Sequence, residues 1–532
     1  MRASPWASSR PRREPPGRAF APHAWLLAAL LAALYLVLDP PSADLAAQTY
    51  RTWLFEHAGP TIWDNGWYAG HHVPAYSILF PPLAALLGPR LVGALAAVAA
   101  AWAFERLALL ARGEQGRPAA LWFATATAVS LVTGRLTFAL GLAAGLLAIL
   151  ALARGRMALC AVAGAATALA SPVAAAFLAL ALVAWGVTHR RLRLTALLCA
   201  ATLAPALALT VLFPEGGDFP FTASAFWPSL AATLLVLLLL PREQRTLRLG
   251  VALYAVLVVV SGALSTPMGG NAVRLGAVFA GPLAAIALWP DRRRALLLLL
   301  LPLAYWQVSS PIDDVVQASR DRSVQASYYD GMLRFLATRP GDPFRVEIPF
   351  TDNHWESARV APTVPLARGW ERQLDRKVNG LFYDGQPLTA ARYRGWLDEN
   401  AVRYVALADA PIDYSAAAEA ALVRSRPPYL REVYRDAHWR IFAVAAAAPM
   451  ARGAGARVVA MDSDTVDLDV PRAGRILVRV RFTPYWRIVR GHGCVAPAGD
   501  WTQLTVTAPG RVRLATDFAL SRVRATGPRC TR

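Results

Sequence analysis

The hydrophobic pattern divides the chain into two parts. Up to about residue 309, apolar residues form runs of roughly 15 to 22 residues, the length that a helix needs to cross a bilayer. The candidate spans are 20–38, 83–110, 118–133, 137–153, 157–170, 172–187, 194–213, 225–240, 249–264, 277–290 and 295–309. The pattern therefore predicts a polytopic α-helical membrane domain over 20–310, with about 11 spans, followed by a region of mixed polarity.

The region after the last apolar run predicts two further folded parts. Short apolar strands (RVEIPF, RYVALA and WRIFAV) alternate with helical patterns at 323–338 and 387–400, which predicts an α/β domain over 311–450. Residues 451–532 instead show strands separated by turns. In 475–482 (RILVRVRF) the apolar side chains fall on one face and the arginines on the other, so we expect a β-sandwich-like domain.

The charge pattern adds a topology. The 532-residue chain carries a formal charge of +20, and nearly all of its cations are arginines, because Lys377 is the only lysine. Many of these arginines lie in alternate short loops, namely Arg112, Arg117, Arg154, Arg156, Arg190, Arg191, Arg193, Arg242, Arg245, Arg248, Arg292, Arg293 and Arg294. The positive-inside rule then places those loops and the N-terminus in the cytoplasm. An odd number of spans places the C-terminal region outside, and the arginines indicate topology rather than a nucleic-acid partner.

The first residues extend this topology. Residues 1–19 are basic and proline-rich, which predicts a disordered cytoplasmic tail. The apolar run at 20–38 resembles a signal peptide, but Asp39 and two prolines follow it rather than a small-residue cleavage site. We therefore expect a retained first span and a multi-pass protein of the cytoplasmic membrane.

The longest loop between spans, 39–82, is predicted outside and is rich in polar and aromatic residues. Ser42 is a suitable helix cap, and Asp44 would lie in the first turn, where the helix dipole favours a carboxylate. The segment after Asp44 predicts an amphipathic helix along the membrane surface. Trp67 and Tyr68 belong to a set of rings suited to the headgroup depth.

This loop also supplies candidate chemistry. Asp44 and Asp64 would lie near lipid depth, where a carboxylate of suitable pKa can act as a general base. Alternatively, Asp64 caps the turn at Asn65-Gly66. His71 and His72 are adjacent rather than four residues apart, so the sequence favours an interfacial polar contact over a metal site, and a role in binding substrate stays open.

Two arginines in loops predicted outside break the positive-inside rule. Arg135 lies in the turn VTGRLTF, and Arg274 follows Gly269, Gly270 and Asn271 in a flexible loop. A guanidinium at the outer surface is a candidate ligand for a lipid phosphate, because it offers a planar fork of donors. The alternative is an arginine that contacts bulk headgroups or caps a helix.

These segments carry a family resemblance. The stretch WDNGWYAGHHVPAYSILFPPL (63–83), the turn GRLTFALG (134–141) and the loop GGNAVRL (269–275) resemble the GT-C superfamily. Its members are polytopic glycosyltransferases that use lipid-phosphate-linked sugars outside the cytoplasmic membrane. In the C-terminal region, IPFTDNHWE (348–356) and ARGWERQLD (367–375) resemble the extracytoplasmic domains of GT-C-like and YfhO-like bacterial membrane proteins.

The resemblance implies a function and a site. It implies transfer of a hexosyl or pentosyl group from a polyprenyl-phosphate donor to a cell-envelope acceptor, a glycan or a protein, at the outer face of the membrane. The implied catalytic residues are Asp44, with Asp39 and Asp64 as competitors; the implied substrate-binding residues are Arg274, Arg135, Asn271, His71, His72, Trp67 and Tyr68. Some members need a divalent metal and others do not, and the sequence shows no clear metal constellation. The loop lacks the paired Asp-x-Asp of several branches. A transporter and a non-catalytic envelope-assembly protein are the alternatives.

Two further groups of residues lie in the predicted external region. Asp352, His354 and Glu356 alternate along a possible strand, where a polar edge is favoured over a metal or sugar site. Cys494 and Cys530 both fall in the β-sandwich-like domain. Because an external domain is in an oxidising compartment, we expect a disulfide between them.

Overall fold

The computed structural model describes residues 23–531, which form two compact units. The helical unit contains residues up to Pro41, Tyr76–Ala208 and Asp218–Gln317. The C-terminal unit contains Ala318–Arg532 and two excursions from the first part of the chain, Ser42–Ala75 and Leu209–Gly217. Most of the long loop predicted at 39–82 therefore packs as part of the C-terminal unit. The predicted tail (1–19) and the start of the first predicted span lie outside the described residues.

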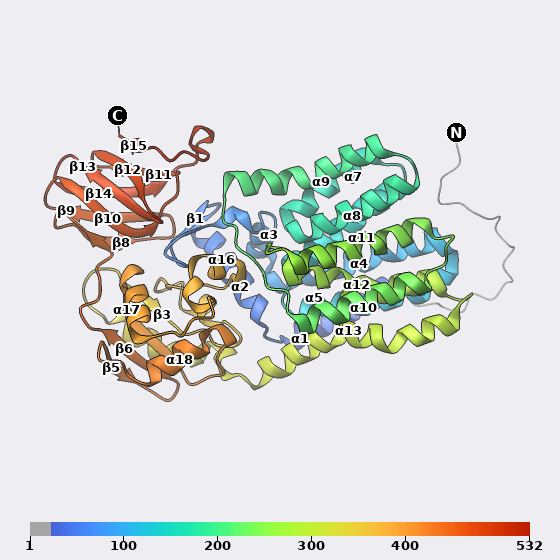
Figure 1. Cartoon of the computed structure of the whole chain (residues 1–532), viewed down its shortest axis with the longest axis horizontal. Helices are drawn as coiled ribbons and strands as arrows, with labels where there is room; N and C mark the ends of the chain where they lie inside the picture. The colour runs from blue at the N-terminus through green and yellow to red at the C-terminus, as the bar shows by residue number, and fades with distance from the viewer. Residues whose placement is uncertain (1–22, 532) are drawn as a thin grey trace. The chain divides into compact units, whose positions relative to one another are not determined.

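The helical unit contains an α-helix at every position where an apolar run predicted one. They appear in blue to yellow-green in Figure 1. Its helices are α1 (Ala24–Leu38), α3 (Phe80–Leu87), α4 (Pro89–Arg112), α5 (Arg117–Val132), α6 (Leu136–Ala153), α7 (Met157–Ala170), α8 (Pro172–Thr188), α9 (Leu192–Leu212), α10 (Ala223–Leu239), α11 (Arg245–Ala263), α12 (Val273–Leu288) and α13 (Arg293–Arg320).

Helix length separates these helices into two groups. Within the described residues, 6 helical segments are long and apolar enough to cross a membrane, or up to 7 if α1 and the helix after it count as one bent span. One of the 6 is Pro89–Val132, which contains both α4 and α5. The 14-residue α7 is about 21 Å long at 1.5 Å per residue, shorter than the hydrocarbon core of a bilayer. The predicted number of about 11 spans is thus not shown.

Small residues allow the helices of this unit to approach closely. A Cβ added to Gly141 on α6 would lie 2.8 Å from the Cβ of Ser171, which precedes α8. Phe104 and Phe123 stack at 4.2 Å between α4 and α5, inside a core made largely of alanines. The buried Glu105 accepts a hydrogen bond from the backbone N–H of Ala24 at 3.0 Å and so caps the start of α1. The predicted helical membrane domain therefore folds as a close-packed bundle.

The first part of the C-terminal unit is a mixed sheet with helices. Its strand order is β3-β4-β6-β5, with β3 (Arg345–Glu347) parallel to β4 (Val402–Ala408) and the other neighbours antiparallel. β6 spans Trp439–Val444, and β5, which the pattern did not predict, spans Leu430–Arg435. Its helices are α14 (Asp330–Ala337), α15 (Glu356–Arg359), α16 (Arg372–Val378), α17 (Ala390–Glu399) and α18 (Ala417–Arg424). The predicted mixed α/β region is confirmed.

The last part is a pair of antiparallel sheets, drawn in orange to red in Figure 1. The strand orders are β15-β12-β13-β10-β7 and β11-β14-β9-β8. The strands are β7 (Ala451–Arg452), β8 (Arg457–Met461), β9 (Thr465–Val470), β10 (Gly474–Arg481), β11 (Trp486–Arg490), β12 (Gly493–Ala498), β13 (Trp501–Val506), β14 (Gly510–Thr516) and β15 (Arg529–Cys530). Ile476, Val478 and Val480 are fully buried in the shared core, as the alternation in β10 predicted.

Two local predictions were wrong for identifiable reasons. The helix expected over 323–338 is two 3-10 turns followed by α14, and the Asp321 carboxylate caps the first of these turns by accepting a hydrogen bond from the Ser323 N–H. The strand expected around TDNHWE is a turn. Thr351 makes only an isolated bridge with Ile412, and His354 has a φ of 55° in the left-handed region.

The helix expected in the first loop is present as α2 (Ala43–Ala58), but it is not a helix lying free on a surface. It packs against α15 in the C-terminal unit. Leu45, Tyr50 and Leu54 are buried there, and so are the polar Gln48 and Arg51. The following chain pairs β1 (Trp63–Asp64) with β2 (His71–His72) as a small antiparallel ribbon.

Candidate functional site

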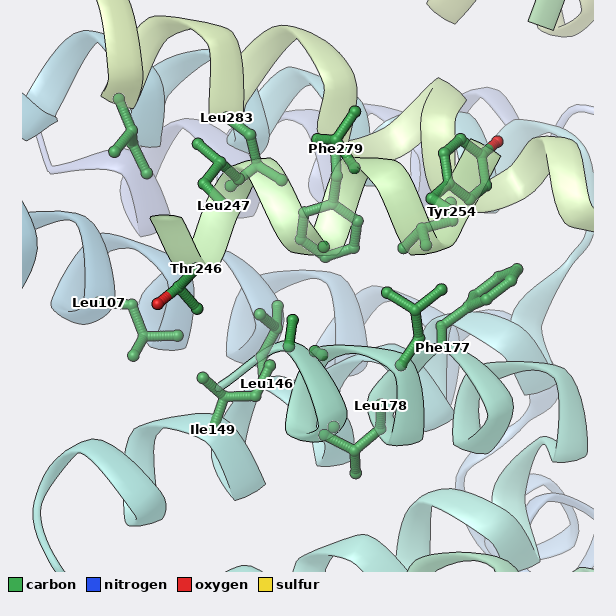
Figure 2. A pocket seen from close by; sticks show the side chains of 18 of the residues that line it. Leu107, Leu146, Ile149, Phe177, Leu178, Thr246, Leu247, Tyr254, Phe279 and Leu283 are labelled. Atoms are coloured by element: carbon green, nitrogen blue, oxygen red, sulfur yellow. The ribbon is translucent and has the colours of Figure 1, made fainter. Parts of the chain in front are cut away.

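The helical unit contains a half-open cavity of about 620 Å³ between its helices. Figure 2 shows its walls: Phe279 and Tyr254 come from one pair of helices, α12 and α11, and face Phe177 and Leu178 of α8. The wall is almost entirely apolar along its length. Polar side chains at the start of α11, such as Thr246, line one end, and Tyr254 lies toward the other. A long apolar cavity with polar ends is suited to a lipid chain.

Arg274 lies beside one end of this cavity. Its guanidinium carbon is 5.7 Å from the ring centroid of Phe138, and Phe138 lines the cavity. The next two residues, Leu275 and Gly276, also line it. The hydroxyl of Tyr254 donates to the Ala272 carbonyl at 3.0 Å and accepts from the Gly276 N–H at 3.2 Å, which fixes the first turn of α12. The structure thus places a half-buried cation next to residues that line an apolar cavity.

Arg135 and Asn271 belong to the same end of the helical unit. Arg135 directly precedes α6, three residues before Phe138, and its backbone N–H donates to the Ser130 carbonyl at 2.9 Å. Asn271 is buried in a 3-10 turn, where its amide donates to the Pro267 carbonyl at 3.1 Å. Asn271 therefore holds the loop that presents Arg274, which is a positioning role.

The three candidate aspartates lie in different surroundings. Asp39 follows α1 in the helical unit and pairs with Arg90 at 2.5 Å, with its carboxylate largely exposed. Asp64 is fully buried in the C-terminal unit. Asp44 is half-buried in the first turn of α2, as the sequence predicted. Asp39 and Asp64 each have a structural role, as the ion-pair partner of Arg90 and as the cap of a buried turn, and Asp44 remains the base that the family resemblance implies.

Asp64 is the centre of a buried polar group. Its carboxylate accepts hydrogen bonds from the Tyr50 hydroxyl at 3.0 Å and from the Gly66 N–H at 2.9 Å, so it caps the turn as the alternative interpretation predicted. Burial raises the pKa of Asp64 to about 7, although these two bonds and Arg51 oppose the shift. Asp64 is therefore partly protonated at neutral pH.

The two histidines differ despite being adjacent. Nδ1 of His71 lies 3.7 Å from the Asp64 carboxylate, and burial lowers the pKa of His71 to about 4. His72 pairs with Glu215 at 2.8 Å and contacts the Thr483 hydroxyl at 3.0 Å. Glu215 lies in the acidic PEGGDF loop, so His72 joins three distant segments of the C-terminal unit. Both histidines are buried rather than interfacial contacts.

Trp67 and Tyr68 are also buried structural residues. Trp67 stacks on Tyr50 with centroids 4.3 Å apart, and its indole N–H donates to the Ser357 carbonyl at 3.1 Å. The Tyr68 hydroxyl donates to the Gly369 carbonyl at 2.6 Å and accepts from the Glu371 N–H at 2.7 Å. The rings expected at headgroup depth instead attach the first loop to the segment around Trp370.

The sequence did not predict a network of buried charges in the C-terminal unit. Arg368 binds Asp375 at 2.6 Å and Glu419 at 3.2 Å, and all three side chains are essentially fully buried. Arg372 binds Asp413 at 2.7 Å nearby. Arg368 and Arg372 lie in a motif that carried the family resemblance. Their partners Glu419 and Asp413 are more than 40 residues away along the chain, so no local pattern reveals these pairs.

His354 and its neighbours form part of this interior. His354 stacks on Trp370 with centroids 3.4 Å apart and lies 3.5 Å from Asp413 and 3.7 Å from Glu356. Within residues 23–531, no group of three or more His, Cys, Asp or Glu side chains is arranged to hold a metal ion. The His354 group is thus a buried polar contact. The exposed polar edge favoured for this segment was wrong for His354 and Glu356, which are 1% exposed.

The predicted disulfide is present. Cys494 and Cys530 are bonded between the paired strands β12 and β15. A disulfide persists in oxidising compartments, so it is compatible with an extracytoplasmic C-terminal unit.

Comparison with known proteins gives no family. No protein-family model matches the chain, and no curated protein matches it significantly. What is established is a unit of apolar helices, several of membrane-spanning length, and a C-terminal mixed α/β and antiparallel β region.

Proposed function

We propose that the chain is a membrane-embedded glycosyltransferase that uses a polyprenyl-phosphate-linked sugar at the outer face of the membrane. The observation that carries this proposal is the apolar cavity with Arg274 at its end, 5.7 Å from the ring of the lining residue Phe138. An isoprenoid chain fits an apolar cavity between helices, and a guanidinium suits the phosphate at the head of that chain. Arg135, just before α6, is the second proposed phosphate ligand.

The proposed reaction needs a base as well as a cation. The acceptor hydroxyl oxygen attacks the anomeric carbon and forms the new glycosidic bond, while the bond between that carbon and the phosphate oxygen breaks. The electron pair of the broken bond goes to the phosphate, whose charge the arginines stabilise. The hydroxyl proton goes to the Asp44 carboxylate. The family resemblance implies Asp44 for this role; Asp44 is half-buried in the first turn of α2, in the C-terminal unit.

The first test is native mass spectrometry of the purified protein. We expect a polyprenyl phosphate or its glycoside to co-purify with the wild type and to be lost from Arg274→Ala. Arg154→Ala is the matched control, because Arg154 lies at the opposite end of α6 from Arg135. Bulk phospholipid alone in all three proteins would contradict the proposed donor site.

The second test separates an enzyme from a lipid carrier. The cavity by itself also suits a transporter or a non-catalytic lipid-binding assembly protein, so binding does not decide between them. Asp44→Asn removes the proposed base and leaves the cavity unchanged. We expect this variant to keep the co-purified lipid and to lose sugar transfer in vesicles supplied with polyprenyl-phosphate hexose or pentose. Unchanged transfer by Asp44→Asn would exclude Asp44 as the base, and no transfer by wild type would favour the carrier.

A further inference from the structure

The C-terminal unit contains a second cavity, which we name the arginine cleft. It has a volume of about 470 Å³ and lies between strands β4, β5 and β6 on one side and the segment that leads into β8 on the other. Its charged and aromatic lining residues are Asp342, Phe344, Arg403, Tyr404, Arg431 and Arg457. None of the sequence patterns discussed above pointed to it, because its walls come from segments far apart in the chain.

A row of paired residues in the sheet forms the floor of the arginine cleft. Tyr404 of β4 pairs with Ala443 of β6, and Ala443 pairs in turn with Arg431 of β5. Paired residues in an antiparallel sheet point to the same face, so these three side chains form one row. The methyl group of Ala443 is small and lies between two long side chains, so the row leaves a depression with a ring on one side and a guanidinium on the other.

The charges of the arginine cleft are unbalanced in favour of cations. Arg403, Arg431 and Arg457 line it, against the single carboxylate of Asp342. Arg457 lies 3.5 Å from Asp342 and 3.6 Å from Asp469, so those carboxylates are directed to one of the three arginines. The cleft therefore keeps an excess of positive charge, which attracts an anion.

One of these arginines is fixed in place. Arg403 donates to the Pro340 carbonyl at 3.3 Å, and its guanidinium carbon lies 5.4 Å from the Phe344 ring centroid and 5.5 Å from that of Tyr404. A guanidinium held in this way loses little conformational entropy when it binds an anion.

We propose that the arginine cleft binds an acidic saccharide, a sugar that carries a carboxylate or a phosphate. The cleft volume is within the range of small-molecule sites of about 300–1,000 Å³ and leaves room for a sugar ring as well as its anionic group. A nucleic acid is less suited, because single strands bind along extended basic grooves with open stacking faces, and Arg403 covers both rings here. This proposal is independent of the glycosyltransferase activity proposed above.

The test is isothermal titration calorimetry of the full chain in detergent micelles with tri-galacturonic acid as the probe. Maltotriose, inorganic phosphate and a short oligothymidine are the comparison ligands. The variant is Arg431→Gln, which removes one exposed guanidinium from the floor without disturbing a buried contact. Arg435→Gln is the control, because Arg435 lies on the same strand but pairs with Glu432 at 2.7 Å and does not line the cleft.

We expect tri-galacturonic acid to bind the wild type and the Arg435→Gln control alike, and to bind Arg431→Gln about tenfold more weakly, as for the loss of one charge-assisted hydrogen bond. We also expect the affinity to fall with added salt and maltotriose not to bind. Equal affinity of Arg431→Gln and the control would overturn the proposal. So would equal or tighter binding of phosphate alone or of oligothymidine, and so would the absence of binding by tri-galacturonic acid.

Discussion

The two units differ in how many charged side chains they bury and in how much apolar empty space they contain. Among the described residues, Glu105 is the one charged side chain of the helical unit that is buried, and the unit keeps a large apolar cavity. The C-terminal unit buries many charged side chains and pairs some of them with one another, as it does Arg368 with Asp375 and Glu419. Buried charge is costly in helices suited to a bilayer, whereas elsewhere a buried charge is tolerated when a counter-ion pairs with it.

This difference predicts which kind of substitution affects each unit most. The stability of the C-terminal unit depends on long-range partners, so removal of one buried charge leaves another without its counter-ion. The helical unit depends on small residues and close packing, so added volume changes what its cavity can hold. The three predictions that follow test this contrast, in order of decreasing effect.

The largest effect is expected from Arg368→Ala. The substitution leaves Asp375 and Glu419 buried without the cation that binds both at 3.2 Å or less. We expect a loss of about 3–5 kcal/mol in the stability of the C-terminal unit, measured as a lower melting temperature by tryptophan fluorescence. Arg435→Ala, an exposed arginine, is the control and should melt like the wild type. Equal melting temperatures for the two variants would contradict the idea that buried pairs stabilise this unit.

An intermediate effect that depends on pH is expected from Asp64→Asn. The folded pKa of Asp64, about 7, is above its unfolded value, so the folded state binds more protons and this group loses stability as pH rises from about 4 to 7. His71 opposes this change up to about pH 6.5, because its folded pKa of about 4 is below its unfolded value. Asp64→Asn removes only the contribution of Asp64 to this pH dependence. We therefore expect it to become more stable relative to wild type by a few kcal/mol between pH 5 and pH 8.

Melting temperatures at pH 5, 6, 7 and 8 measure this difference. Asp500→Asn is the matched control, because the Asp500 side chain is 80% exposed and should give the same difference from wild type at every pH. A difference between Asp64→Asn and wild type that does not change with pH would mean that Asp64 is ionised in the folded protein throughout this range.

The smallest effect is expected at Gly250, which lies in α11 and lines the cavity of the helical unit. A Cβ there would lie 3.7 Å from the Cβ of Ala184, an ordinary contact. Gly250→Ala should therefore be tolerated and gain about 0.5–1 kcal/mol from helix propensity. Gly250→Phe should fill part of the cavity and lower the amount of co-purified lipid, measured by mass spectrometry. Unchanged lipid in Gly250→Phe would show that the lipid binds elsewhere.

The sequence predicted the positions of the helices better than their extent as spans. Long apolar runs predicted helices such as α6 and α11 because apolar composition over such a length leaves few alternatives. The run at α7 also formed the helix that it predicted, but a helix of 14 residues is short for a span, so a span there is not shown. In the candidate site, the sequence singled out Arg274, Asp44 and Asp64 from their places in predicted loops. It could not tell that Asp64 would be buried beneath Tyr50 while Asp44 would be half-buried.

The sequence by itself determined the apolar helices, the alternating β strands and the disulfide pairing of Cys494 with Cys530, because each depends on residues that are close in sequence or few in number. Only the tertiary structure decided that the first loop packs within the C-terminal unit, that Arg274 lies beside an apolar cavity and that three arginines line one cleft. These arrangements bring together residues that are far apart in the chain, and their stability comes from packing and charge pairing, which no local pattern encodes.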